Sequence, residues 1–175
     1  SWFKKGGGPV IDMGPYYFTA LVNLLGPAKS VRAKATKVQD YRTIATGPKK
    51  GDKFEVEIPT SIIGSIEFKN SAVIQFFLSF DVINHQRNHI ELYGTKGSMI
   101  VPDPNMFGGS VFSSYSESGE WKEYSSSNML IGKMNIFNKS VRSNEQPEVA
   151  NYRGVGLSEM IDAIENKRTN RCNGE

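Results

Sequence analysis

Between Ser30 and Asp81 apolar and polar residues follow one another with a period of two. This is the period of a β-strand, whose successive side chains point to opposite faces. In residues 72–81 (AVIQFFLSFD) one face would carry Ile74, Phe76, Leu78 and Phe80. Short polar connections such as Asn70-Ser71 favour antiparallel hairpins. Strands are predicted at residues 30–42, 53–59, 61–70, 72–81, 89–94 and 98–102, with shorter ones at 110–116 and 121–125.

Helical spacing of apolar residues occurs at the two ends of the strand-rich stretch. Residues 9–25 begin with Pro9, which suits the first position of a helix, and end before Gly26-Pro27, which stops one. Pro15 lacks the N–H that would bond back one turn, so an irregular turn is expected there. A last helix is predicted to start near Tyr152, with a buried stripe of Leu157, Met160, Ile161 and Ile164. Together these elements predict an α+β domain, a large open, mainly antiparallel sheet with helices packed on one face.

The length and composition fit one globular domain. The chain has 175 residues, of which 38% are hydrophobic, enough to bury a sizeable core. Its apolar runs fall short of the roughly 20 residues that cross a bilayer, and its first residues lack the apolar region of a secretory signal. A single cysteine, Cys172, and the absence of a Cys/His cluster support neither a disulfide nor a zinc site. We therefore expect a cytoplasmic protein with no metal and no membrane partner.

Positive charge gathers between Lys29 and Lys53, where eight Lys and Arg residues stand against Asp40 and Asp52. A nucleic-acid-binding surface would interleave such charge with stacking aromatic residues, and only Tyr41 lies within the stretch. Lysines also protect an exposed edge strand from pairing with another chain. The edge-strand interpretation is favoured, and no nucleic-acid partner is expected.

Two glycine-rich stretches resemble phosphate-binding loops only in composition. GGGP, at residues 6–9, lacks a preceding strand, and TGPKKGDK, at residues 46–53, lacks the spacing of a P-loop. Neither GxGxxG nor GxxxxGKS/T occurs in the chain. Tight turns are the favoured role of these glycines, so the chain is not expected to bind a nucleotide by itself.

Four polar residues are candidates for a ligand site. Asp12 and Tyr16 are one helical turn apart, which would place both side chains on one face of the first helix. His85 follows the end of a strand, and Arg153 begins the last helix, where a cation opposes the helix dipole. Each also has an ordinary explanation, because an acid near a helix start complements the dipole, a tyrosine packs and a loop histidine is solvated. The residues alone leave both interpretations open.

Three stretches, taken in order, resemble one family. They are GGGPVIDMGPYYFTALVNLLGPAKSV (6–31), HIELYGTKGSMIVPDPNMFGG (89–109) and NYRGVGLSEMIDAIENKRTN (151–170). They resemble the C-terminal domain of the Gfo/Idh/MocA oxidoreductases, the glucose–fructose oxidoreductase and inositol dehydrogenase family. The resemblance implies that residues 1–175 form a substrate-binding and oligomerisation domain, with an N-terminal Rossmann domain and a final helix outside this chain. NAD or NADP would be bound by that Rossmann domain.

The same resemblance implies roles for the candidate residues. The family's pocket helix reads D-x-x-x-H, whose two side chains flank the reacting carbinol; Asp12 matches the aspartate, and Tyr16 stands where the histidine is expected. An ordinary imidazole exchanges a proton near pH 7, whereas an ordinary phenol has a pKa near 10. The resemblance implies an NAD(P)-dependent oxidoreductase (dehydrogenase) of a sugar, cyclitol or related polyol, with Asp12 and Tyr16 catalytic and His85 and Arg153 binding substrate. This chain alone would be inactive.

Two further expectations complete the sequence-based interpretation. The alternative function is that of a family member that has lost turnover and binds a sugar or a partner protein. Tyr16 supports this alternative, because it replaces the expected histidine. Self-association is also expected, because Val73 and Phe77 give the second face of strand 72–81 an apolar character. Two helices cannot cover both faces of a large sheet, and exposed apolar surface marks interfaces. A homo-oligomer formed through the sheet face is predicted.

Overall fold

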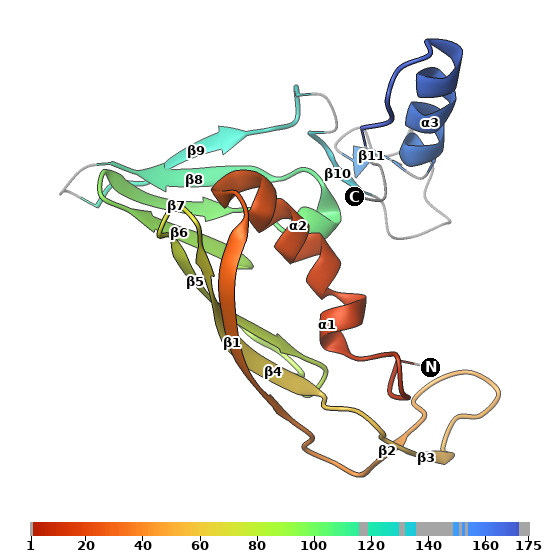
Figure 1. Ribbon diagram of the computed structural model, residues 1–175. Helices are drawn as coiled ribbons and strands as arrows, with labels where there is room; N and C mark the ends of the chain where they lie inside the picture. Colours follow the sequence, from red (N-terminus) through yellow and green to blue (C-terminus); the bar gives the residue numbers. More distant parts are fainter. Residues whose placement is uncertain are drawn as a thin grey trace. The chain divides into compact units, whose positions relative to one another are not determined.

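The computed structural model describes residues 2–115, 119–129, 132–135, 149–150, 152 and 154–171. The chain divides into two compact units, Ser1–Arg87 and Asn88–Glu175. Among the described residues the first unit contains two α-helices and the second contains one α-helix and a short 3-10 helix, and each unit has its own antiparallel sheet (Figure 1). The predicted α+β class is confirmed.

The first unit combines two consecutive helices with a three-stranded sheet. Its elements are α1 (Pro9–Asp12), α2 (Gly14–Leu25), β1 (Ala28–Thr36), β2 (Tyr41–Thr43), β3 (Lys53–Glu55), β4 (Ser61–Phe68) and β5 (Val73–Ser79). The antiparallel sheet has the order β1-β4-β5, and β2 and β3 form a separate antiparallel pair. The predicted alternation in β5 is confirmed, because Ile74, Phe76 and Leu78 are half-buried while Val73, Gln75 and Phe77 are exposed.

The helix pair lies along one face of the β1-β4-β5 sheet (Figure 1). Phe18 of α2 meets Phe76 of β5 edge-on, with ring centroids 5.2 Å apart. Gly64 of β4 leaves room for this ring, because a Cβ at Gly64 would lie 2.6 Å from it. Leu21 is the buried apolar residue of α2. In this unit the helices cover one sheet face, as predicted.

A break separates the two helices at Met13. Asp12 ends α1 and Gly14 begins α2, with Pro15 within the first turn of the second helix. Since proline has no N–H to continue the helical hydrogen bonds, the chain restarts its helix there. The irregular turn predicted from Pro15 is confirmed.

The strand predicted over residues 30–42 is interrupted. β1 ends at Thr36, which pairs with Ser61 at the start of β4, and the chain pairs again only from Tyr41, opposite Glu55 of β3. The long-strand prediction is therefore wrong in its extent, because the pairing partner changes between the two segments. All nine residues of β1 are exposed, and β1 lies at the edge of its sheet, as the lysine pattern suggested.

The second unit is built on a four-stranded antiparallel sheet. Its elements are β6 (Ile90–Gly94), β7 (Gly97–Val101), the short 3-10 helix η1 (Pro104–Met106), β8 (Ser110–Ser114), β9 (Lys122–Ser125), β10 (Met134–Asn135), β11 (Val149–Ala150) and α3 (Val155–Glu165). The sheet order is β6-β7-β8-β9, while β10 and β11 form a short parallel pair. Hydrogen bonds thus group the described strands into separate sheets, whereas one large sheet was expected. Most of the long loop expected over residues 125–148 lies outside the described residues.

The stripe of α3 is not buried as predicted. Its apolar members are 43–69% exposed, namely Leu157, Met160, Ile161 and Ile164. Ala163, on another side of the helix, is the buried residue of α3. Helical periodicity identified the helix correctly, but it does not reveal which side of a helix meets the rest of the unit.

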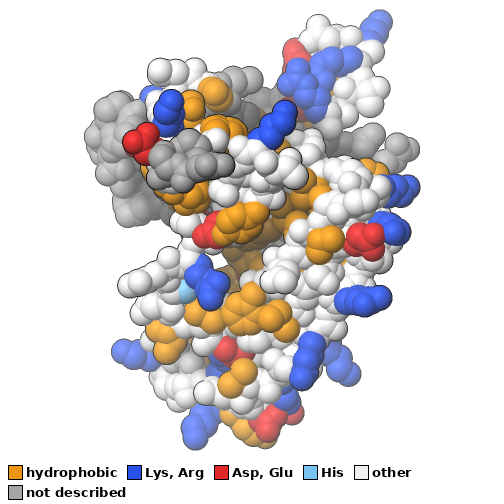
Figure 2. Space-filling model, turned by 90° about the vertical axis from the view of Figure 1, so that its left-hand side faces the viewer, with side chains coloured by type: hydrophobic (Ala, Val, Ile, Leu, Met, Phe, Trp, Pro, Cys, Tyr) orange, Lys and Arg blue, Asp and Glu red, His pale blue; other side chains and the backbone are white. Residues whose placement is uncertain are grey.

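The outer face of the first unit's sheet exposes large apolar side chains. Ile63 and Phe77 stand directly opposite each other on β4 and β5, and they are 58% and 57% exposed. Val73, two register positions along the same face, is 66% exposed. On the side of the molecule drawn in Figure 2, apolar side chains form patches among Lys and Arg side chains. Ile63, Val73 and Phe77 are called the outer-face residues below.

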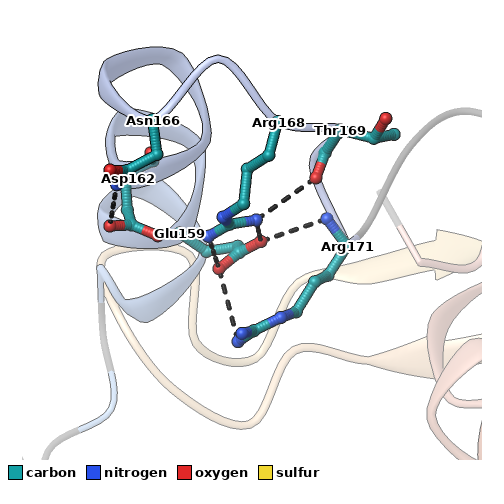
Figure 3. Close-up of polar contacts among 6 residues, drawn as sticks. All are labelled: Glu159, Asp162, Asn166, Arg168, Thr169 and Arg171. Atoms are coloured by element: carbon teal, nitrogen blue, oxygen red, sulfur yellow. Dashed lines mark hydrogen bonds and ion pairs between the residues drawn. The ribbon is translucent and has the colours of Figure 1, made fainter.

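A cluster of charged residues joins the C-terminal end of α3 to the chain that follows it (Figure 3). The Glu159 carboxylate accepts hydrogen bonds from both terminal nitrogens of Arg168, at 2.7 and 2.9 Å, and from the backbone N–H of Arg171 at 3.1 Å. Arg168 also pairs with Asp162. The hydrogen bonds from Arg168 and Arg171 lower the pKa of Glu159 from about 4.5 to about 2. Guanidinium groups thus fix the segment 168–171 against the helix.

This cluster predicts an acid-sensitive attachment of residues 168–171. Because the folded-state pKa of Glu159 is lowered, its stabilising contribution is fully present above pH 4.5 and is lost as the pH falls towards about 2. A carboxyl ¹³C NMR titration should place the midpoint of Glu159 near 2, and the protection factor of the Arg171 amide, relative to an unfolded chain at the same pH, should fall over the same range. In Glu159→Gln the exchange should already be fast at neutral pH. A midpoint near 4.5 would show that the cluster does not persist in solution.

Candidate functional site

Asp12 and Tyr16 flank the break between α1 and α2. The backbone N–H of Asp12 donates to Gly8 at 2.9 Å, and that of Tyr16 donates to Met13 at 3.2 Å. Asp12 is half-buried, and Tyr16 is 48% exposed. Within the described residues neither side chain has a hydrogen-bond or ion-pair partner. A carboxylate and a phenol that lack protein partners beside an irregular turn are available to bind a ligand.

The start of α1 is held firmly against the connection between β3 and β4. Gly8 has a φ of 113° and lies against Ile58, since a Cβ on Gly8 would come within 3.3 Å of the Ile58 side chain. Only glycine adopts this backbone conformation without strain at so close an approach. Pro9, the first residue of α1, is fully buried. Asp12 therefore stands on a rigid support.

A hollow of about 410 Å³ lies farther along α2, lined among the described residues by Phe18, Thr19, Val22 and Asn23. Neither Asp12 nor Tyr16 lines it. The hollow is thus separate from the predicted pair.

The other two predicted site residues are His85 and Arg153. His85 is exposed in the connection between β5 and β6, where residues 82–88 have no regular secondary structure. No hydrogen bond or ion pair joins His85 to Asp12 or Tyr16. Arg153 lies outside the described residues.

A polar cluster around Asp81 has no counterpart in the sequence-based interpretation. Asp81 lies just after β5, is 13% exposed, and pairs with Arg42. It also accepts hydrogen bonds from Thr60 and Ser61. Period-two patterning carried no signal for these partners, because strand register and the turn after β1 bring them together.

Neither a metal-binding cluster nor a membrane-spanning helix occurs among the described residues. No group of three or more His, Cys, Asp or Glu side chains in these residues is arranged to hold a metal ion. In the same part of the chain no helix has the length and apolar character needed to span a bilayer.

The class of protein defined by this fold is an α+β domain with antiparallel sheets and a broken helix pair that covers one sheet face. Residues 1–100 match the family model described as the GFO/IDH/MocA C-terminal domain. The chain therefore belongs to the GFO/IDH/MocA family, and the predicted resemblance is confirmed. No curated protein sequence matches it.

Solved structures of similar fold have low sequence identity to the chain. Levoglucosan dehydrogenase in complex with NADH and levoglucosan is 16% identical with a TM-score of 0.65, over 96% of this chain and 45% of that chain. Aldose-aldose oxidoreductase from Caulobacter crescentus, complexed with glycerol, is 18% identical with a TM-score of 0.59, over 97% of this chain and 41% of that chain. An NAD binding oxidoreductase from Klebsiella pneumoniae is 21% identical with a TM-score of 0.55, over 70% of this chain and 34% of that chain. The chain thus spans less than half the length of these proteins, and the likeness establishes the fold.

Proposed function

We propose that this chain is the substrate-binding domain of an NAD(P)-dependent oxidoreductase that acts on a sugar, a cyclitol or a related polyol. The observation that supports it is the pair Asp12 and Tyr16, whose side chains have no hydrogen-bond or ion-pair partner among the described residues and lie inside the matched family domain. Solved proteins of similar fold are described as complexes with levoglucosan, L-sorbose or glycerol, which are all polyhydroxylated. We therefore propose a domain that binds the hydroxyl groups of the substrate beside a hydride-accepting cofactor.

The two side chains have distinct proposed roles. A carboxylate accepts hydrogen bonds, so Asp12 orients the hydroxyl groups of the substrate. A phenol hydroxyl group is a hydrogen-bond donor, so Tyr16 donates a hydrogen bond to the oxygen of the reacting carbon. His85 and Arg153 are proposed to contact more distant parts of the substrate.

The nicotinamide cofactor does not fit this chain. A pyrophosphate is bound where a glycine-rich turn leads from a strand into a helix N-terminus, and the sequence has no GxGxxG. We propose that a Rossmann domain outside the chain binds NAD or NADP, which accepts or supplies the hydride when it is present. The chain is then the C-terminal domain of a longer protein.

Calorimetry should detect no saturable binding of NAD, NADP or their reduced forms to this chain. The expected result follows from the missing pyrophosphate site. Micromolar saturable binding would contradict the proposed division between a cofactor domain and a substrate domain.

A direct test of the function is an assay of the protein that includes the nucleotide-binding domain. Levoglucosan, L-sorbose and myo-inositol serve as substrates, and reduction of NAD and NADP is measured. Reduction with at least one polyol is expected. If no polyol is oxidised, and no corresponding ketone is reduced, the catalytic proposal is wrong.

A second candidate function is binding without turnover. Tyr16 favours it, because the family resemblance leads one to expect a histidine at this position, and a phenol is a poor proton acceptor at neutral pH. Such a protein would bind a sugar or a partner protein through the same surface. Saturable sugar binding to the longer protein, without any oxidation or reduction, would distinguish it from the enzyme.

We also propose that the chain self-associates through the outer-face residues Ile63, Val73 and Phe77. Exposed apolar surface marks interfaces, and identical subunits pair through self-complementary patches. Sedimentation at micromolar concentration should show an oligomer that Phe77→Ser shifts towards the monomer. Val31→Ser is the matched control, because Val31 is 64% exposed but lies on the opposite face, paired with Ile66. A strict monomer, or equal effects of both variants, would contradict the proposal.

A further inference from the structure

We propose that Asp81 is a positioning residue for the candidate site, because its carboxylate fixes the two segments that carry Asp12 and His85. The binding and catalytic roles of Asp12 and His85 rest on the proposed function. The structural role of Asp81 rests on its contacts in the first unit, and the experiments test the two roles separately.

Donors from two segments, Thr60-Ser61 and β2, converge on the Asp81 carboxylate. Oδ2 accepts from the hydroxyl groups of Thr60 and Ser61, each at 2.6 Å, and Oδ1 accepts from the guanidinium group of Arg42. Because the single proton of the Ser61 hydroxyl goes to Asp81, the 2.6 Å contact between Ser61 and Ser79 is donated by Ser79. The Ser79 oxygen then accepts from the backbone N–H of Asp81 at 2.9 Å. The side chain and the backbone of Asp81 are both fixed.

The charge of this carboxylate is maintained by its partners. Burial would raise the pKa of Asp81, but the hydrogen bonds from Ser61 and Thr60 and the charge of Arg42 outweigh burial and hold it below its ordinary value. The carboxylate is therefore ionised at neutral pH, where it attracts Arg42 most strongly.

Through Arg42 the cluster reaches the segment in front of α1. The guanidinium carbon of Arg42 lies 4.9 Å from the centre of the Phe3 ring. That ring also contacts Phe54 and Phe80, at centroid distances of 5.4 and 5.3 Å. Nε of Arg42 is buried with no hydrogen-bond partner in the described part of the chain. The position of Arg42 therefore depends on Asp81 and on the face of the Phe3 ring.

The same segment is held a second time by Glu57. The backbone N–H of Glu57 donates to the carbonyl oxygen of Phe3 at 2.9 Å. Its carboxylate accepts from the Lys4 ammonium group at 2.6 Å and from the Lys5 N–H at 3.3 Å. Three glycines, residues 6–8, separate Lys5 from Pro9, which is buried at the start of α1. The path from Asp81 towards Asp12 thus runs through contacts as far as Lys5 and then through the glycine segment into the helix.

A second path runs through Thr60, which is completely buried. Thr60 closely follows Ile58, the residue on which Gly8 lies at the start of α1. The carbonyl oxygen of Thr60 accepts a hydrogen bond from the backbone N–H of Phe80 at 2.8 Å. Asp81 therefore fixes both the support of α1 and the point at which β5 gives way to the exposed connection that carries His85.

The positioning proposal is tested on this chain by NMR, with Asp81→Asn compared with the wild type. The amides of Asp12 and Met13, which donate to Gly8 and Pro9, should exchange at least tenfold faster in the variant. The ring signals of His85 should shift. Those of His89, the other histidine of the chain, lie in the second unit and should not move. The Asp12 carboxyl ¹³C shift should also change, which a loosening confined to the sheet would not produce.

Three further variants keep the test decisive if Asp81→Asn does not fold. Thr60→Val is nearly isosteric and removes one of the two hydroxyl donors to Oδ2, so it should give the same pattern with a smaller amplitude. Arg42→Met should also accelerate exchange at Asp12, and Arg42→Lys should restore part of the protection because the positive charge returns. Arg32→Met is the matched control, since it removes a guanidinium group from β1 that has no hydrogen-bond or ion-pair partner among the described residues and acts only on the charge of Glu67.

The outcomes separate this inference from the proposed function. Unchanged exchange at Asp12 and Met13, or equal acceleration throughout the unit, would overturn the positioning role whatever the activity of the wild type. In the protein that includes the nucleotide-binding domain, Asp81→Asn should lower kcat at least tenfold and change KM for levoglucosan less than threefold, because a misplaced Asp12 affects the reacting geometry most. A rise in KM alone would also overturn it. Absence of activity in the wild type would contradict the proposed function, and the NMR result would still decide the positioning role.

Discussion

Replacing Asp12 by asparagine is expected to lower kcat/KM about ten- to a hundredfold in the protein that includes the nucleotide-binding domain. The reason is the loss of one oriented, charged hydrogen bond at the transition state, which corresponds to about 1.5–3 kcal/mol. The melting temperature should barely change, because the Asp12 side chain has no partner among the described residues. The measurement is a pH–rate series with thermal unfolding recorded alongside.

Tyr16→Phe is the companion variant, because it removes only the hydroxyl group. If the phenol moves a proton, the rate should fall by about a hundredfold or more and the pH profile should change. If Tyr16 only packs against the substrate, the rate should stay near that of the wild type. Unchanged kinetics in both variants would remove the pair from the active site and favour binding without turnover.

Replacing Phe68 by alanine is expected to cost about 3–5 kcal/mol of unfolding free energy. Phe68 is 1% exposed and ends β4, where its backbone N–H donates to Ala72 at 2.8 Å. Removing the ring leaves a cavity that the surrounding sheet cannot fill, and the cost is a large part of the stability of a small domain. Urea unfolding measures the loss.

The matched control for this prediction is Phe77→Ala on the neighbouring strand. Phe77 is 57% exposed, so at concentrations where the chain is monomeric its removal should change the unfolding free energy by no more than about 0.5 kcal/mol. Equal losses in the two variants would show that burial does not distinguish these phenylalanines.

Local patterns were sufficient for most of the elements. The period of two in β5 and the helical period in α2 come from the chain's own geometry, so apolar spacing reveals them directly. Pro15 likewise predicted the break at Met13, because a missing N–H is a property of the residue itself. The ends of β1 and the exposure of α3 were not predictable in this way, since both depend on which segment a strand or helix meets.

The candidate site also has one part that the sequence predicted and one part that only the fold created. Asp12 and Tyr16 were proposed from sequence, because they are near neighbours on one helix pair and because a family motif matches their spacing. The Asp81 cluster joins Phe3, Arg42 and Thr60, which are far apart along the chain. Residue spacing in a sequence does not predict contacts between segments so far apart.

The sequence by itself determined the α+β class, the antiparallel strands, the broken first helix and the family to which the chain belongs. Those features follow from local periodicity, from proline chemistry and from the order of three motifs. Only the tertiary structure decided that β1 stops at Thr36, that the stripe of α3 is exposed, and that Asp81 holds Arg42, Thr60 and Ser61. The physical reason is that strand register and side-chain burial depend on contacts between distant segments, and these contacts form only when the chain has folded.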